Sequence, residues 1–200
     1  PHKYPENYKK LPQQIILGSE TASTVSSRGV YKFPVQKGAS VMYDDHQCSG
    51  YDVECCSWSN LPDEDFALAD DYDWTIGQFV WTGFDYLGEP SPYSTDSWPS
   101  HSSVFGIIDL ASLPKDRFYL YRSLWNKQAN TLHVLPHWTW PGREGENTPV
   151  FVYTSYPSAE LFVNGKSYGK QRKLTADESR ALEGQDSLAL QRRYRLMWMD

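Results

Sequence analysis

One short apolar segment, which ends abruptly in Gly18, Ser19 and Glu20, constrains the fold more than any other stretch of the sequence. Residues 13–18 are too few for a helix and include branched apolar side chains, so they predict a buried β-strand. Gly18 allows the backbone to turn sharply or to approach another group closely. Glu20 is then expected just past the C-terminal end of the strand. In parallel α/β folds ligands and catalytic groups gather at that end, although a glutamate there can also simply cap the segment that follows.

The first 128 residues repeat this order of strand, loop and helix. Three acidic residues follow Asn60 and Pro62, and they predict a helix that begins near residue 62 with Asn60 as its cap. Residues 75–86 predict a second buried strand. Residues 114–128 predict a second helix with an aromatic stripe that faces the core. Strands that alternate with helices indicate a parallel sheet covered by helices.

Near residue 130 the pattern changes to short strands joined by turns. Asn164 and Gly165 form the dipeptide that most strongly predicts a tight hairpin turn. Such a series of strands is typical of an antiparallel β-sandwich. We therefore expect two domains, a parallel α/β unit over residues 1–129 and an incomplete β-sandwich over residues 130–200. The strands of the second domain are predicted at 131–138, 149–154, 159–163, 166–170 and 194–199.

Composition and charge exclude several classes of function. The formal net charge is −6, and no basic run precedes the arginines that begin at Arg192, so we expect no nucleic-acid partner. No apolar run approaches the length of a membrane span, so we expect no membrane partner. Cys48, Cys55 and Cys56 are odd in number and lack zinc-ligand spacing, which predicts free thiols and no metal site.

Aromatic side chains are frequent, with 8 Trp, 14 Tyr and 8 Phe residues. Their flat apolar faces can stack on sugars, and they can equally fill a large hydrophobic core. Composition alone leaves both interpretations open.

Several motifs, in a fixed order along most of the chain, resemble glycoside hydrolase family 2 and in particular its bacterial β-galactosidases. The resemblance implies that residues before 130 form the last βα units of a TIM (β/α)8 barrel. It implies a partial immunoglobulin-like β-sandwich after that point. The segments that carry the resemblance are residues 15–20 and 77–90 for the last two barrel strands, 119–125 for the final barrel helix, and 133–143 and 159–166 for the sandwich.

The resemblance also implies a retaining mechanism with two carboxyl groups about 5–5.5 Å apart. Glu20 matches the nucleophile, which forms the covalent glycosyl-enzyme. Trp81 matches the tryptophan that forms the floor of the sugar site. Asp85 and Glu89 follow it, and each either bonds to sugar hydroxyls or orients its loop. The acid/base of the family is the Glu of an Asn-Glu pair, which is absent from the sequence, so we expect the 200-residue chain to be inactive alone.

The implied substrates are terminal β-D-galactosides. Residues 101–109 lack the Asn-x-Lys motif by which β-glucuronidases bind a substrate carboxylate, although β-glucuronidase and β-mannosidase stay open as alternatives. An alternative of another class is a non-catalytic carbohydrate-binding or structural β-sandwich module. The strand–helix–strand half of the chain argues against that module.

The expected partner is a carbohydrate substrate, and no cofactor is implied. Two strands and two helices cannot close a barrel, and their apolar faces would be exposed. We therefore expect either a larger protein around this chain or a homo-oligomer. Family analogy alone suggests a periplasmic or secreted location.

Overall fold

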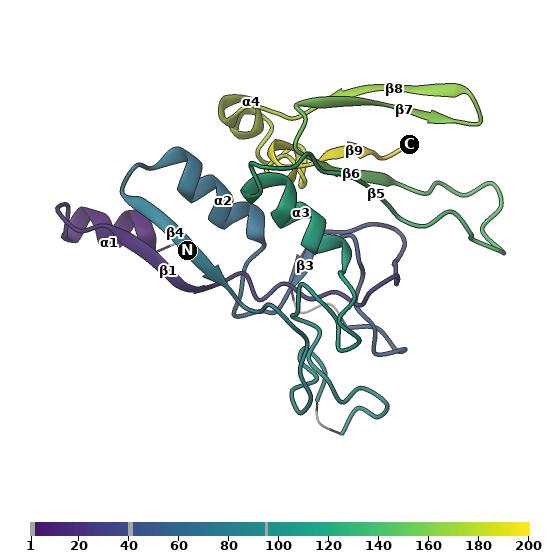
Figure 1. Cartoon of the computed structure of the whole chain (residues 1–200), viewed down its shortest axis with the longest axis horizontal. Coiled ribbons are helices and arrows are strands. Elements are labelled where there is room, and N and C mark those ends of the chain that lie inside the picture. The colour runs from purple at the N-terminus through teal and green to yellow at the C-terminus, as the bar shows by residue number, and fades with distance from the viewer. Residues whose placement is uncertain (1–2, 40–41, 95) are drawn as a thin grey trace.

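The computed structural model describes residues 3–39, 42–94 and 96–200, and it combines helices with several small sheets (Figure 1). The elements of the first part are α1 (Tyr4–Lys10), β1 (Ile16–Thr21), β2 (Gly38–Ala39), β3 (Glu54–Cys55), α2 (Pro62–Asp71), β4 (Thr75–Val80) and α3 (Asp116–Trp125). The elements of the second part are β5 (Leu132–Leu135), β6 (Val150–Thr154), β7 (Ser158–Val163), β8 (Lys166–Arg172), α4 (Ala176–Ala181), the 3-10 helix Gln191–Arg193 and β9 (Leu196–Trp198).

Strands β1 and β4 pair in parallel, with Gly18 opposite Gln78 and Thr21 opposite Val80. The sequence predicted this parallel pair and the two helices, α2 and α3, that follow its strands in the chain. Figure 1 shows α2 beside β4 and α3 beside β5 and β6. The helices therefore lie between the parallel pair and the strands of the second part.

Three details of the predicted first part are wrong. Strand β1 continues to Thr21, so Glu20 lies inside the strand instead of past its end. The strand is not buried, because β4 is its one partner strand in the described residues and Leu17 is 47% exposed. Helix α2 has Leu61 as its N-cap, because the Asn60 amide donates instead to Leu61 O and Asp65.

The predicted strands after residue 130 are confirmed as antiparallel pairs. Strand β6 lies between β5 and β9, and β7 pairs with β8. Asn164 and Gly165 both have positive φ values, 50° and 80°, as a tight hairpin turn requires. The hairpin packs Ala159 and Leu161 against a small apolar cluster on β6 and β9, formed by Val150, Val152, Leu196 and Trp198.

A single hydrophobic cluster joins residues from before and after residue 130. Phe66 of α2 and Leu120 and Tyr121 of α3 pack in it with Phe151 and Tyr153 of β6. Aromatic rings meet edge-on here, as between Phe66 and Tyr121 at 5.4 Å. Of the predicted aromatic stripe of α3, Tyr121 and Leu124 pack in or against this core, whereas Trp125 is 48% exposed. The two expected domains share that core.

A buried ion pair connects the start of α2 to the segment before β9. Arg195 donates two hydrogen bonds to the carboxylate of Asp63, at 2.6 and 2.7 Å, and both side chains are fully buried. The guanidinium also lies 5.2 Å from the ring centre of Tyr153, whose hydroxyl donates to Asp52. Burial raises the pKa of Asp52 to about 6, although Arg117 and Arg195 oppose this rise.

Candidate active site

Glu20 lies near the C-terminal end of β1, and Trp81 directly follows the C-terminal end of the neighbouring strand β4. The N–H of Trp81 donates to Thr21 O at 2.8 Å, and the Thr21 hydroxyl donates to Gln78 Oε1 at 2.6 Å. The Glu20 side chain is exposed, and no described side chain donates a hydrogen bond to it. Its carboxylate is therefore accessible to a ligand at the end of the sheet.

Gly18 lets other side chains approach this end of β1. A Cβ atom at this position would lie 2.6 Å from Thr21 Cγ2 and 2.8 Å from Tyr4 Oη. Both distances are too short for non-bonded atoms, so a larger residue would displace its neighbours. The close approach predicted from the sequence is confirmed.

Trp81 is 38% exposed, and its ring lies beside that of Tyr86. The rings of Trp81 and Tyr86 meet edge-to-face, with centroids 6.0 Å apart. The Tyr86 hydroxyl donates to a Glu89 carboxylate oxygen, and partial burial together with this hydrogen bond raises the pKa of Tyr86 to about 12. Tyr86 therefore stays a neutral donor and holds the exposed Glu89 carboxylate near Trp81.

Asp85 has a different setting, because its side chain turns into the protein. Oδ1 accepts from the N–H of Gly106 at 2.7 Å, and Oδ2 pairs with Lys115 Nζ at 2.7 Å. A Cβ at Gly106 would lie 2.2 Å from Asp85 N, so glycine is required for this close approach. These contacts favour the interpretation that Asp85 orients its loop.

Two buried cations at the start of α3 fasten the loops that follow β1 and β4. Lys115 Nζ donates to Ser26 O at 2.7 Å and to Val104 O at 3.2 Å. Arg117 donates to Thr24 O, Phe105 O and Gly106 O. Burial and the nearby Arg117 lower the pKa of Lys115 to about 8, and the pair with Asp85 opposes this shift. The ends of both strands are thus held by one helix.

Sequence reasoning missed Lys115 and Arg117. Cations are unfavourable near a helix N-terminus because the helix dipole is positive there. Two cations at the start of a predicted helix therefore indicated that other groups of the protein compensate their charge. In the structure the carbonyl oxygens of two loops compensate both charges.

Breaking the Asp85–Lys115 pair should destabilise the protein. We expect Asp85→Asn to lower the free energy of unfolding by about 3 kcal/mol, because the buried ammonium group then faces an amide donor instead of a carboxylate. Chemical denaturation measures this change. Asp45→Asn is the matched control, since Asp45 pairs with Lys32 at the surface, and it should cost less than about 1 kcal/mol. An Asp85→Asn variant as stable as the control would contradict this role.

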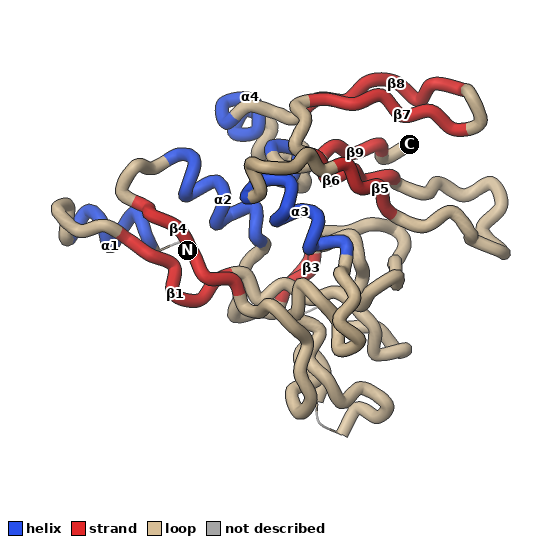
Figure 2. The backbone as a smooth tube through the Cα atoms, viewed as in Figure 1, coloured by secondary structure: helices blue, strands red, loops and turns tan. Residues whose placement is uncertain are grey.

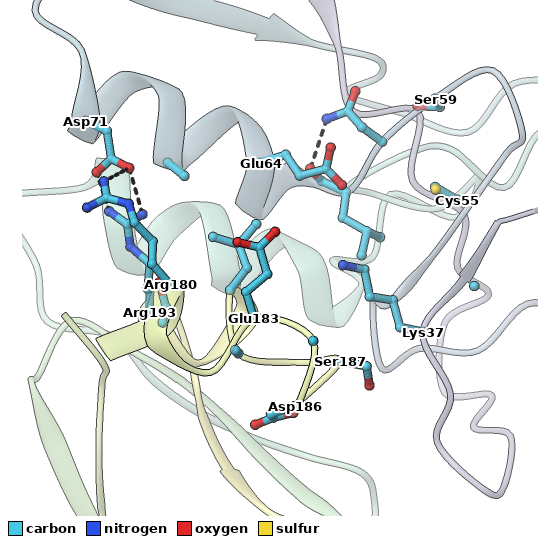
Figure 3. A pocket seen from close by; sticks show the side chains of 18 residues that line it. Lys37, Cys55, Ser59, Glu64, Asp71, Arg180, Glu183, Asp186, Ser187 and Arg193 are labelled. Carbon is cyan, nitrogen blue, oxygen red and sulfur yellow. Dashed lines mark hydrogen bonds and ion pairs between the residues drawn. The ribbon is translucent and has the colours of Figure 1, made fainter. Parts of the chain in front are cut away.

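A cavity that is larger than any at the strand ends described above lies away from these residues. It has a volume of about 840 Å³ and opens between α2 and the segment around residues 179–193 (Figure 3). Arg180 and Arg193 at its edge both pair with Asp71. A smaller cavity of about 260 Å³ adjoins Asp85 and includes His46 and His101 in its lining. We favour the ends of β1 and β4 as the active site, because Glu20 and Trp81, the predicted nucleophile and sugar-binding residue, lie there.

Other features of the described residues bear on the site only indirectly. Cys48, Cys55 and Cys56 are buried free thiols. No group of three or more potential metal ligands comes together in the described ranges. The helices of the described chain include none long and apolar enough to cross a membrane.

Several known proteins are similar to this chain in sequence or in fold. The family model described as "Domain of unknown function (DUF4982)" matches residues 145–200. The β-galactosidase BoGH2A of Bacteroides ovatus is 41% identical over 172 residues, which are 82% of this chain and 20% of that relative. A putative β-glucuronidase of Formosa agariphila is 41% identical over 103 residues, which are 51% of this chain and 10% of that relative.

The crystal structure of a β-glycosidase from Bacteroides vulgatus has a similar fold. It superposes with a TM-score of 0.73 and 28% sequence identity, over 97% of this chain and 25% of that one. The chain therefore spans about a fifth of the length of the Bacteroides ovatus relative and a quarter of the Bacteroides vulgatus chain.

Proposed function

We propose that the chain belongs to glycoside hydrolase family 2, and on that premise that it carries the nucleophile of a retaining β-glycosidase. The parallel pairing of β1 and β4 supports this proposal most directly, since it brings Glu20 and Trp81 to the same end of one sheet. We assign residues 1–129 to the last βα units of a (β/α)8 barrel and residues 130–200 to an immunoglobulin-like sandwich.

Glu20 attacks the anomeric carbon of the substrate and forms a glycosyl ester, while the glycosidic oxygen leaves as an alcohol. A second carboxylic acid, about 5–5.5 Å away in enzymes of this type, protonates the leaving oxygen and then activates the water that cleaves the ester. The sequence contains no Asn-Glu pair, so in this proposal the second carboxyl group comes from outside the 200 residues. The exposed carboxylate of Glu20 suits attack on a ligand at the strand end.

Trp81 offers a flat apolar surface on which the apolar face of a pyranose can stack. Glu89, which Tyr86 holds in place, accepts hydrogen bonds from sugar hydroxyls. Asp85 does not contact the sugar in this proposal. It positions the loop that carries Glu89 through its contacts with Lys115 and Gly106.

We propose terminal β-D-galactosides as the substrates. BoGH2A, which matches 82% of this chain in sequence, is named a β-galactosidase. Residues 101–109 contain no Asn-x-Lys motif for a substrate carboxylate. β-Glucuronidase is the second candidate, because relatives with that name match about half of the chain.

An assay of the longest protein that the gene encodes tests this function. We expect it to hydrolyse nitrophenyl β-D-galactoside with a higher kcat/KM than the corresponding glucuronide or mannoside. The 200-residue chain alone should hydrolyse none of them. Preference for the glucuronide would favour the second candidate. Absence of hydrolysis by the long protein, with carbohydrate binding retained, would instead support a non-catalytic module.

A further inference from the structure

Beyond β4 the described residues 86–94 and 96–103 form an excursion, which we call the 86–103 loop. Its two ends run side by side, because Ser103 N donates to Tyr86 O at 2.7 Å and Gly88 N donates to His101 O at 3.0 Å. Figure 2 shows the loops after β1 and β4 projecting from the ends of these strands, away from the strands of the second part. Since Tyr86 contacts Trp81, the base of the loop lies at the candidate active site.

The segment that follows β1 anchors the 86–103 loop. The buried Tyr93 donates its hydroxyl to Gln47 O at 2.9 Å and accepts from Tyr43 N at 3.1 Å. His46 Nδ1 donates to Ser97 O at 3.0 Å. The described parts of the loop on both sides of residue 95 are therefore held by the segment that follows β1.

The anchored loop presents Trp98, whose side chain is 78% exposed and is the most exposed large apolar side chain in the described structure. Its ring stacks on the ring of His101, with centroids 5.5 Å apart and planes 16° apart. Beside them lies the cavity of about 260 Å³, whose lining includes Ser100, Ser102 and Ser103. A flat aromatic face with hydroxyl groups next to it complements a pyranose, which has apolar faces and a rim of hydroxyls.

We propose that Trp98 and His101 form the subsite for the sugar on the leaving-group side of the scissile bond. This inference rests on the proposed function. Trp81 and Glu20 occupy the strand ends and take the sugar that becomes covalently bound. The next sugar of a glycan then extends outward along the 86–103 loop, where Trp98 stacks on it and His101 fixes the indole. The substrates are therefore oligosaccharides in preference to glycosides of small alcohols.

Two substrates with the same terminal sugar test this subsite in the longest protein that the gene encodes. One is the disaccharide and the other is the methyl glycoside of the sugar that the wild type accepts. Trp98→Ala should lower kcat/KM for the disaccharide about tenfold, which corresponds to the loss of one stacked ring. It should leave kcat/KM for the methyl glycoside unchanged, and Trp98→Phe should retain much of the disaccharide activity.

Trp138→Ala is the matched control, because Trp138 is also an exposed tryptophan but lies between β5 and β6. It should change neither rate. If Trp98→Ala keeps full activity on the disaccharide, or loses activity equally on both substrates, the subsite assignment is wrong although the proposed function stands. If the wild type hydrolyses no β-glycoside, the proposed function fails, and the subsite fails with it.

Discussion

Glu20→Gln should lower kcat/KM for β-glycosides by about 10,000-fold or more, equivalent to about 5 kcal/mol of transition-state stabilisation. The amide has the size of the carboxylate but cannot form the glycosyl ester, because it carries no negative charge. The side chain is exposed and makes no hydrogen bond within the described residues, so the fold should be unaffected. Steady-state kinetics of the longest protein that the gene encodes measures the effect.

Two further variants make this prediction specific. Glu183→Gln changes another exposed glutamate, in the turn after α4, and should leave kcat/KM unchanged. Glu20→Gly opens space for azide, which should restore turnover of an activated aryl β-glycoside. Azide then attacks the anomeric carbon, the aryl alcohol leaves, and the product is the α-glycosyl azide. Activity of Glu20→Gln within tenfold of the wild type would contradict the assignment.

Arg195→Met should lower the free energy of unfolding by about 3–5 kcal/mol, because it leaves the Asp63 carboxylate buried without its partner. Both side chains have no exposed surface, and the guanidinium binds both carboxylate oxygens. The same guanidinium reaches Tyr51 O and the Tyr153 hydroxyl at 3.4 Å. Chemical denaturation measures the change.

Arg180→Met is the control for the loss of an arginine at the surface. Arg180 pairs with Asp177 and Asp71, but more than half of its side chain is exposed, so we expect a cost below about 1 kcal/mol. The double variant Asp63→Leu/Arg195→Met should recover most of the loss, since the carboxylate that Arg195 neutralises directly is removed with it. Equal effects of Arg195→Met and Arg180→Met would show that the buried pair does not organise this core.

Local sequence signals predicted much of this fold. Asn164 and Gly165 adopt the positive φ values that their dipeptide favours. Pro62 and the acidic residues behind it begin α2, although the cap is Leu61 instead of Asn60. These features depend on a few neighbouring residues, which is why a single sequence reveals them.

Contacts between distant residues were not predictable in this way. Asp63 and Arg195 lie 132 positions apart. The residues next to each of them in the sequence indicate only an ordinary surface charge. The inward turn of Asp85 depends on Lys115 and Gly106, which follow in a later segment. The exposure of β1 likewise depends on which elements cover it, and the alternation of residues within the strand does not contain that information.

Covalent labelling tests the central claim, that Glu20 is the nucleophile, most directly. A 2-deoxy-2-fluoroglycosyl fluoride of the accepted sugar loses its anomeric fluoride as an ester forms, and the fluorine at C2 slows hydrolysis of that ester. Mass spectrometry of the digested protein should find one added fluorosugar on the peptide that contains Glu20, and none in Glu20→Gln. A label on a different carboxylate of the active enzyme would contradict the assignment.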